Sequence, residues 1–225
     1  MPPKIHVVIN RKGGVGKTTL AVNLAATVAS VLGGSPEDCP VLVTSIDPQA
    51  SSVWWAERGE GGGALLPFDF EQIDDESEDI TELKDAEYEH VFIDTPGSFA
   101  RPATLARILD IADDAIIPMI PEPMCYPASE QTLRDFIQPR DLPYRVVRNL
   151  WETRDGKGDL EKLTAWLDEQ GFRYARTPVR KYRMHRDAVA AGQVVTQYPA
   201  GRTATEGRND FLQLALELGY GGSVT

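Results

Sequence analysis

The segment Asn10–Leu20, NRKGGVGKTTL, carries residue types that bind phosphate, in the order and spacing that such binding needs. Three residues without a Cβ atom would let backbone N–H groups approach phosphate oxygens: Gly13, Gly14 and Gly16. Lys17 would reach the β- and γ-phosphates of a nucleotide, and the Thr18 hydroxyl would bind Mg²⁺. Thr19, in the first turn of the following helix, would meet the α-phosphate. The segment predicts a P-loop that binds a nucleotide.

Two acidic residues end two other apolar runs. Asp47 follows Val41–Ile46, and Asp94 ends the apolar part of His90–Thr95, HVFIDT. Both runs have the composition of buried strands, and ligands of open α/β sheets bind at the carboxyl ends of strands. An acid at the end of such a strand is the Walker B arrangement, in which the carboxylate holds Mg²⁺ directly or through water. We therefore expect Asp94 to share a magnesium site with Thr18, and Asp47 to lie at the same edge of the sheet.

The loop departs from the common pattern G-x-x-x-x-G-K-[ST], because Arg11 stands at the first glycine position and Lys12 follows it. The string KGGVGKTT is a deviant Walker A motif and resembles that of the ParA/MinD superfamily of ATPases. The resemblance implies ATP and Mg²⁺ as ligands, and it implies that Lys12 reaches across a dimer interface to the phosphates bound by the other subunit. Catalysis would then require a homodimer that forms on ATP binding. The expected ATP-binding residues are Lys12, Gly13, Gly14, Val15, Gly16, Lys17, Thr18 and Thr19, with Lys12 and Lys17 also catalytic.

The resemblance extends to later motifs. DPQAS, from Asp47, looks like the family's second motif, whose aspartate acts on the attacking water or on the water shell of the metal; this makes Asp47 a candidate catalytic and metal-site residue. DTPG, from Asp94, resembles the family's switch that senses the γ-phosphate. Family members hold the base by late loops, sometimes through an asparagine, so Asn149 is a candidate base contact. Arg11 is the one candidate for an arginine finger in cis, and stimulation by a partner's arginine is expected instead.

The elements that must position these residues alternate along the chain. Expected strands are Lys4–Asn10, Val41–Ile46, part of LLPFDFEQI, His90–Thr95, Ala115–Ile120 and Tyr144–Leu150. Expected helices are Thr18–Leu32, around Glu78–Tyr88, Pro102–Asp113, from about Pro127, Gly158–Gln170 and about Thr203–Leu218. Gly59–Gly63 is expected to be a surface turn, and Pro118 to disturb its strand. The alternation predicts an α/β fold: one P-loop domain over residues 1–225, with a mostly parallel, doubly wound sheet flanked by helices.

Composition excludes several classes of protein. Cys39 and Cys125 are far apart in the sequence, so neither a disulfide framework nor a zinc or iron–sulfur site is expected. No stretch approaches 18 uninterrupted apolar residues and no signal peptide is evident, so a soluble, cytoplasmic protein is expected. The net charge of −11 is concentrated in Asp69–Glu89, which holds eleven carboxylates and one lysine. Arg173–Arg186 holds six basic residues and no acid, so a basic patch is expected on an acidic protein.

The resemblance covers nearly the whole chain and implies a ParA-type partition ATPase. Its ATP-bound dimer would bind DNA without sequence preference and associate with the nucleoid, while a ParB-like or other small DNA-binding adaptor would stimulate slow hydrolysis. The candidate DNA contacts are Arg180, Lys181, Arg183 and Arg186. No helix-turn-helix precedes the P-loop, so operator binding is not expected.

Two alternatives remain open at the level of the sequence. The same ATPase could position a protein cargo or act at a membrane, as MinD relatives do, although the C-terminal FLQLALELGYGGSVT lacks the positive charge of a membrane helix and no membrane partner is expected. A kinase or ligase would need an acceptor-binding residue, and none is singled out. Met124 and Cys125 lie where helices of the second subunit dock in the resembled dimers, but ordinary packing is the preferred interpretation for both.

Overall fold

A computed structural model describes residues 2–35, 38–47, 51–61, 65–73, 80–97 and 102–221. Within these ranges six strands, all parallel, form one sheet in the order β3-β2-β4-β1-β5-β6. The strands are β1 (Lys4–Val8), β2 (Val41–Ser45), β3 (Asp69–Gln72), β4 (His90–Asp94), β5 (Asp114–Met119) and β6 (Tyr144–Arg148). The predicted α/β fold with a parallel, doubly wound sheet is confirmed.

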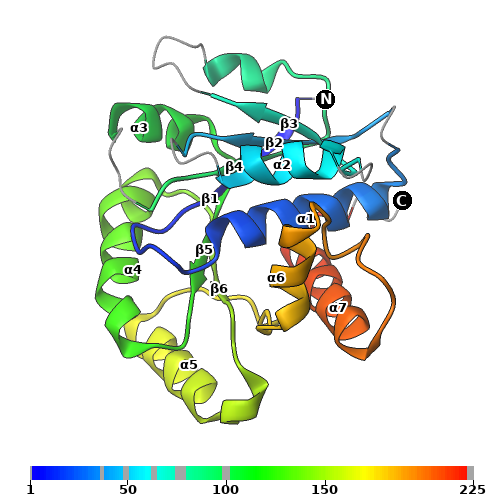
Figure 1. Ribbon diagram of the computed structural model, residues 1–225. Helices are drawn as coiled ribbons and strands as arrows, with labels where there is room; N and C mark the ends of the chain where they lie inside the picture. Colours follow the sequence, from blue (N-terminus) through cyan, green and yellow to red (C-terminus); the bar gives the residue numbers. More distant parts are fainter. Residues whose placement is uncertain are drawn as a thin grey trace.

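Helices cover both faces of the sheet (Figure 1). Successive residues of β1 point to opposite faces, so Ile5 and Val7 join one apolar cluster and Val8 joins the other. One face is covered by α1 (Lys17–Leu32), α2 (Ser51–Gly61), α6 (Arg183–Ala190) and α7 (Arg202–Leu218). The other is covered by α3 (Pro102–Ile111), α4 (Tyr126–Thr132) with its π-helical continuation Leu133–Ile137, and α5 (Gly158–Gln170). The sheet is buried on both faces, as its continuously apolar strands require.

The turn expected at Gly59–Gly63 is wrong for its first three residues, because α2 continues to Gly61. Gly59 is buried there, and a Cβ atom on Gly192 would come within 2.4 Å of the Gly59 nitrogen. The Arg58 Nε atom donates to the Ala190 carbonyl at the end of α6. Gly192 therefore permits close packing of α2 against the end of α6. Gly59 lies within α2 and does not form a turn.

Two further expectations differ from the structure. Around Glu78–Tyr88 the described part contains only a short 3-10 helix, Ile80–Lys84, in which Ile80 and Leu83 are the buried residues; two apolar side chains among many acids give little to anchor a longer helix. Strand β5 runs through Pro118 without a break, in register with Val147. The missing N–H of Pro118 costs little stability because the pairing of β5 with β1 ends at Ile116. The Pro118 carbonyl accepts a hydrogen bond from Asn10 Nδ2 at 2.9 Å instead.

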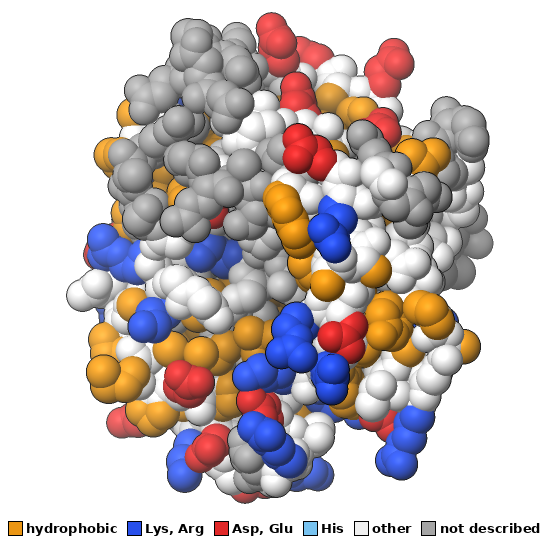
Figure 2. Space-filling view, in the orientation of Figure 1, with side chains coloured by type: hydrophobic (Ala, Val, Ile, Leu, Met, Phe, Trp, Pro, Cys, Tyr) orange, Lys and Arg blue, Asp and Glu red, His pale blue; other side chains and the backbone are white. Residues whose placement is uncertain are grey.

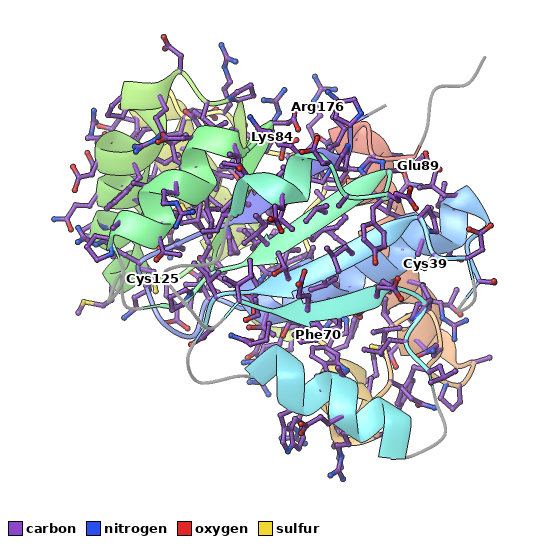
Figure 3. The ribbon with its side chains drawn as sticks, turned by 90° about the horizontal axis from the view of Figure 1, so that it is seen from above. Cys39, Phe70, Lys84, Glu89, Cys125 and Arg176 are labelled. Atoms are coloured by element: carbon purple, nitrogen blue, oxygen red, sulfur yellow. The ribbon has the colours of Figure 1, made fainter. Side chains whose placement is uncertain are left out.

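The two cysteines are free and lie far apart (Figure 3). Cys125 is buried and Cys39 is half-buried, and burial raises the pKa of both thiols above the ordinary value. The described residues contain no helix with the length and apolar character needed to cross a membrane.

Candidate active site

The P-loop connects the end of β1 to the start of α1 and needs its glycines. Gly14 and Gly16 have positive φ angles of 77° and 82°, a region that side chains with a Cβ atom rarely adopt. A Cβ atom on Gly16 would also lie 2.7 Å from Asn149 Nδ2. Asn10 holds the entry to the loop, since its Oδ1 accepts the Lys12 N–H at 2.9 Å. The backbone is thereby curved around the N-terminus of α1, as phosphate binding requires.

Lys17 is held inside the cleft. Its residue is only 7% exposed, and its ammonium donates to the Lys12 carbonyl at 3.4 Å. Burial lowers the pKa of Lys17, while the carboxylates of Asp94 and Asp47 oppose that shift. A Cβ atom on Gly97 would lie 3.4 Å from the Lys17 Nζ atom, so the turn after β4 packs directly on the ammonium. A lysine buried beside two carboxylates is arranged to meet an anionic ligand.

Thr18, at the start of α1, contacts Asp94, at the end of β4. The Thr18 hydroxyl donates to Asp94 Oδ2 at 2.7 Å, and Asp94 is fully buried at the end of β4. The Thr95 hydroxyl donates to the Val8 carbonyl at 2.9 Å and ties the following turn to β1. The described residues contain no group of three His, Cys, Asp or Glu side chains that could hold a metal. One carboxylate with one hydroxyl suits Mg²⁺, which takes its remaining ligands from phosphate and water.

Asp47 follows β2 at the same edge and lines a cleft of about 1090 Å³ together with the P-loop, Pro96 and Gly97. The Asp47 N–H donates to Ser45 Oγ at 3.2 Å. Residues 48–50, the rest of the DPQA string, and Ser98 after DTPG lie outside the described residues. The cleft also has apolar walls that sequence reasoning missed: Trp54, Trp55, Leu150 and Val189. Trp55 is buried, whereas Trp54 is 49% exposed; their position soon after Asp47 was the available signal.

Comparisons with known proteins agree with this geometry. A family model described as an AAA domain matches residues 3–57. The chain is 33% identical over 218 residues to maintenance of carboxysome distribution protein A of Gloeobacter kilaueensis, which covers 96% of this chain and 94% of that protein. The chain belongs to the ParA/MinD superfamily. This superfamily is one of P-loop ATPases.

Two further matches support the assignment to the ParA/MinD superfamily. Protein ParA of Rhizobium radiobacter is 30% identical over 184 residues, covering 78% of this chain and 77% of that protein. A plasmid partition protein from Borrelia burgdorferi B31 bound to AMPPNP has a TM-score of 0.66 at 21% identity, with 96% of this chain and 99% of that chain covered. At that identity the structural match shows the shared fold.

In this ParA/MinD-type loop, Arg11 and Lys12 have different surroundings. Arg11 Nη1 donates to Gln131 Oε1 at 3.1 Å and lies 3.6 Å from the Asp135 carboxylate, so its guanidinium is tied to α4 and its continuation. Arg11 is not among the described residues that line the cleft. Lys12 is half-buried, and its ammonium acts electrostatically on Cys125 at the start of α4. Its reach into a second subunit stays a prediction.

Asn149 is buried directly after β6 and contacts the P-loop itself. Its Nδ2 donates to the Val15 carbonyl at 2.8 Å, and its N–H donates to the Met119 carbonyl at 2.7 Å. The side chain therefore braces the loop against the neighbouring strand β5. Its contact with a base stays a prediction.

The four candidate DNA contacts divide into two kinds. Arg180 is engaged within the fold: its guanidinium binds the Asp210 carboxylate at 2.6 and 2.9 Å and the Glu206 carbonyl at 3.1 Å, so it holds α7 in place, and its contact with DNA stays a prediction. Lys181, Arg183 and Arg186 line a groove of about 430 Å³ near the start of α6. Arg183 and Arg186 have side chains 80% and 77% exposed. Figure 2 shows Lys and Arg side chains gathered around the lower end of α6, with acidic side chains between them.

Proposed function

We propose that this chain binds ATP with Mg²⁺ in the cleft at the P-loop and hydrolyses it slowly. The observation that carries this proposal is the Thr18–Asp94 hydrogen bond beside the buried ammonium of Lys17. Lys17 would neutralise the β- and γ-phosphates, and the backbone of Gly13–Gly16 would cradle them. Thr18 and Asp94 would hold Mg²⁺, which supplies charge neutralisation between the phosphates. Asp47 would orient the attacking water from the opposite side of the loop.

A homodimer that forms on ATP binding completes this site. None of the described residues that line the cleft is an arginine, and Arg11 is tied to α4. An additional cation at the phosphates is the role proposed for Lys12 of a second copy. Met124, 85% exposed beside the loop, supports an apolar contact with that copy, whereas the packing expected for it is wrong. The packing expected for Cys125 is confirmed by its 1% exposure.

The cargo is proposed from the relatives. The alignment with maintenance of carboxysome distribution protein A covers 96% of this chain. This similarity favours ATP-driven positioning of a protein assembly, with DNA as the surface on which the dimer moves. The groove of basic side chains at α6 supports binding to DNA phosphates. Segregation of plasmid or chromosomal DNA through a ParB-like adaptor is the second candidate, supported by the match to protein ParA. A membrane surface is disfavoured because Glu217, exposed near the end of α7, would repel anionic lipid.

Sedimentation with long DNA of random sequence tests the shared part of both candidates. The protein should pellet with DNA in ATP and not in ADP, and the pelleted fraction should fall steeply as salt is raised. Lys17→Ala should abolish the difference between nucleotides. DNA binding that is equal in ATP, in ADP and without nucleotide would contradict the proposal.

Deletion of the gene in its host separates the two cargoes. Clustering of a protein assembly with normal inheritance of plasmids and chromosome would support cargo positioning. Loss of plasmids or anucleate cells would support DNA segregation instead.

A further inference from the structure

The groove near α6 has two walls joined by backbone hydrogen bonds. One wall is the loop after β6, with Glu152 and Arg154, and the other is the segment that enters α6, with Lys181, Arg183 and Arg186. The Trp151 N–H donates to the Val179 carbonyl at 3.1 Å, and the Lys181 N–H donates to the Trp151 carbonyl at 2.8 Å. The walls are thus fixed relative to each other, and four cationic side chains line the space between them.

Glu152 is the one acid among the described residues that line this groove. Its Oε1 lies 2.6 Å from Lys181 Nζ, and its Oε2 lies 2.5 Å from Arg154 Nη2. Its side chain is 25% exposed, whereas those of Lys181 and Arg154 are 55% and 78% exposed. The carboxylate is therefore less exposed than the cations that it joins. The hydrogen bond from Lys181 keeps the pKa of Glu152 below its ordinary value, so the carboxylate is charged at neutral pH.

Two oxygens of one anion, each held by a different cation, form the arrangement that a phosphate group takes between lysine and arginine. The other two cations of the groove are more loosely held. Arg183 and Arg186 lie 3.4 and 3.9 Å from the Asp187 carboxylate, and both are largely exposed. Glu152 lines the same groove as these two arginines, so a DNA backbone that followed them would pass its carboxylate.

We propose that Glu152 is an internal competitor of DNA: its carboxylate occupies a phosphate position in the groove, and a backbone phosphate must displace it. This inference rests on the proposed DNA binding. Exposed ion pairs of this kind are weak, so displacement costs little and the groove remains usable. The effect of Glu152 is to lower the affinity of each protomer for DNA and to keep its release fast. Arg154, which lies outside the basic segment Arg173–Arg186, becomes a DNA contact when Glu152 is displaced.

The test compares Glu152→Gln with Asp110→Asn, both as full-length proteins with ATP. Both substitutions remove one negative charge and release a cation, since Asp110 pairs with Arg140 at 2.9 Å on α3. Binding to a fluorescent duplex of random sequence is followed by anisotropy across about 50 to 200 mM salt. Glu152→Gln should bind roughly three- to tenfold more tightly at the lowest salt. Its slope of log affinity against log salt should be steeper by about 1 to 2, because one or two more phosphates are neutralised. Asp110→Asn should match the wild type.

The gain should shrink when Lys181→Ala is added to Glu152→Gln and disappear when Arg154→Ala is added as well, because both released cations are then missing. Glu152→Ala carries the same expectation as Glu152→Gln, so a folding defect peculiar to one substitution does not decide the outcome. If the wild type binds DNA in ATP but Glu152→Gln binds no better than Asp110→Asn, the competitor role is overturned and the proposed function stands. If neither the wild type nor Glu152→Gln binds DNA in ATP, both are overturned.

Discussion

Replacing Arg180 with alanine separates a structural arginine from a DNA contact. The guanidinium is 25% exposed and makes three hydrogen bonds to Asp210, whose side chain is 9% exposed. Removing one partner of a buried ion pair costs about 3–5 kcal/mol. The partial exposure of Arg180 and the backbone N–H that still reaches Asp210 Oδ2 at 3.0 Å reduce this, so we expect a loss of about 2–3 kcal/mol in the free energy of unfolding.

Urea unfolding measures this loss directly, and thermal melting should show a fall of roughly 4–12 °C for a domain of this size. Adding Asp210→Asn to Arg180→Ala should restore part of the stability, because the buried carboxylate no longer lacks its cation. Arg183→Ala is the matched control: it should leave stability within about 0.5 kcal/mol and reduce the salt dependence of DNA binding by about one phosphate. An Arg180→Ala protein of unchanged stability that has lost DNA binding would refute this reasoning.

Three other substitutions test the cleft and the helix packing. Lys17→Ala should reduce ATP affinity at least a hundredfold by isothermal titration calorimetry, on the order of the 3 kcal/mol that a charge-assisted contact can carry; retained affinity would contradict the P-loop assignment. Lys12→Ala should leave ATP binding to the monomer intact and reduce turnover and ATP-dependent dimerisation, measured by phosphate release and analytical ultracentrifugation; normal turnover would rule out the contact across the dimer. His185 is buried without a hydrogen-bond partner in the described structure, and burial lowers its pKa from 6.5 to about 4. As the pH drops, this histidine is therefore protonated in the unfolded chain before it is protonated in the folded protein. The free energy of unfolding should fall between about pH 6.5 and pH 4. His185→Leu should flatten that fall by roughly 3 kcal/mol in urea unfolding at several pH values, and an unchanged pH profile would show that other groups cause it.

The strand ends and the P-loop were predictable because their signals are local. An apolar run followed by glycines, Lys17 and Thr18 specifies β1, the loop and the start of α1 within about twenty residues. Parallel pairing of β1 with β4 then brings Asp94 to Thr18, since the carboxyl ends of parallel strands share one edge. The limits of α5 and the glycine that ends α1 at Gly33 also follow from nearest neighbours in the sequence.

What the sequence did not show depends on partners that are distant in the sequence. Arg180 has the composition of a DNA contact in its segment, and only the position of α7 shows that Asp210 binds it. Gly59 has the composition of a turn, and only its contact with Gly192 shows why a helix continues there. The base contact of Asn149 stays a prediction, but no local pattern showed that its amide also reaches the Val15 carbonyl, 134 residues earlier in the chain. In each case the residue's role depends on a pairing that no local pattern encodes.

Helix α2 contacts α6, which lines both the nucleotide cleft and the basic groove. It begins four residues after Asp47, and Trp55 and Val189 line the cleft from α2 and α6. The Trp55 Nε1 donates to the Gln193 carbonyl at 3.1 Å, just beyond α6. Gly192 also approaches the backbone at the end of α2 closely. Both contacts are made to backbone atoms, so sliding of one helix past the other would break them. A displacement of α2 by nucleotide must therefore either carry α6 with it or break these contacts, and α6 is the helix that presents Arg183 and Arg186 to the groove.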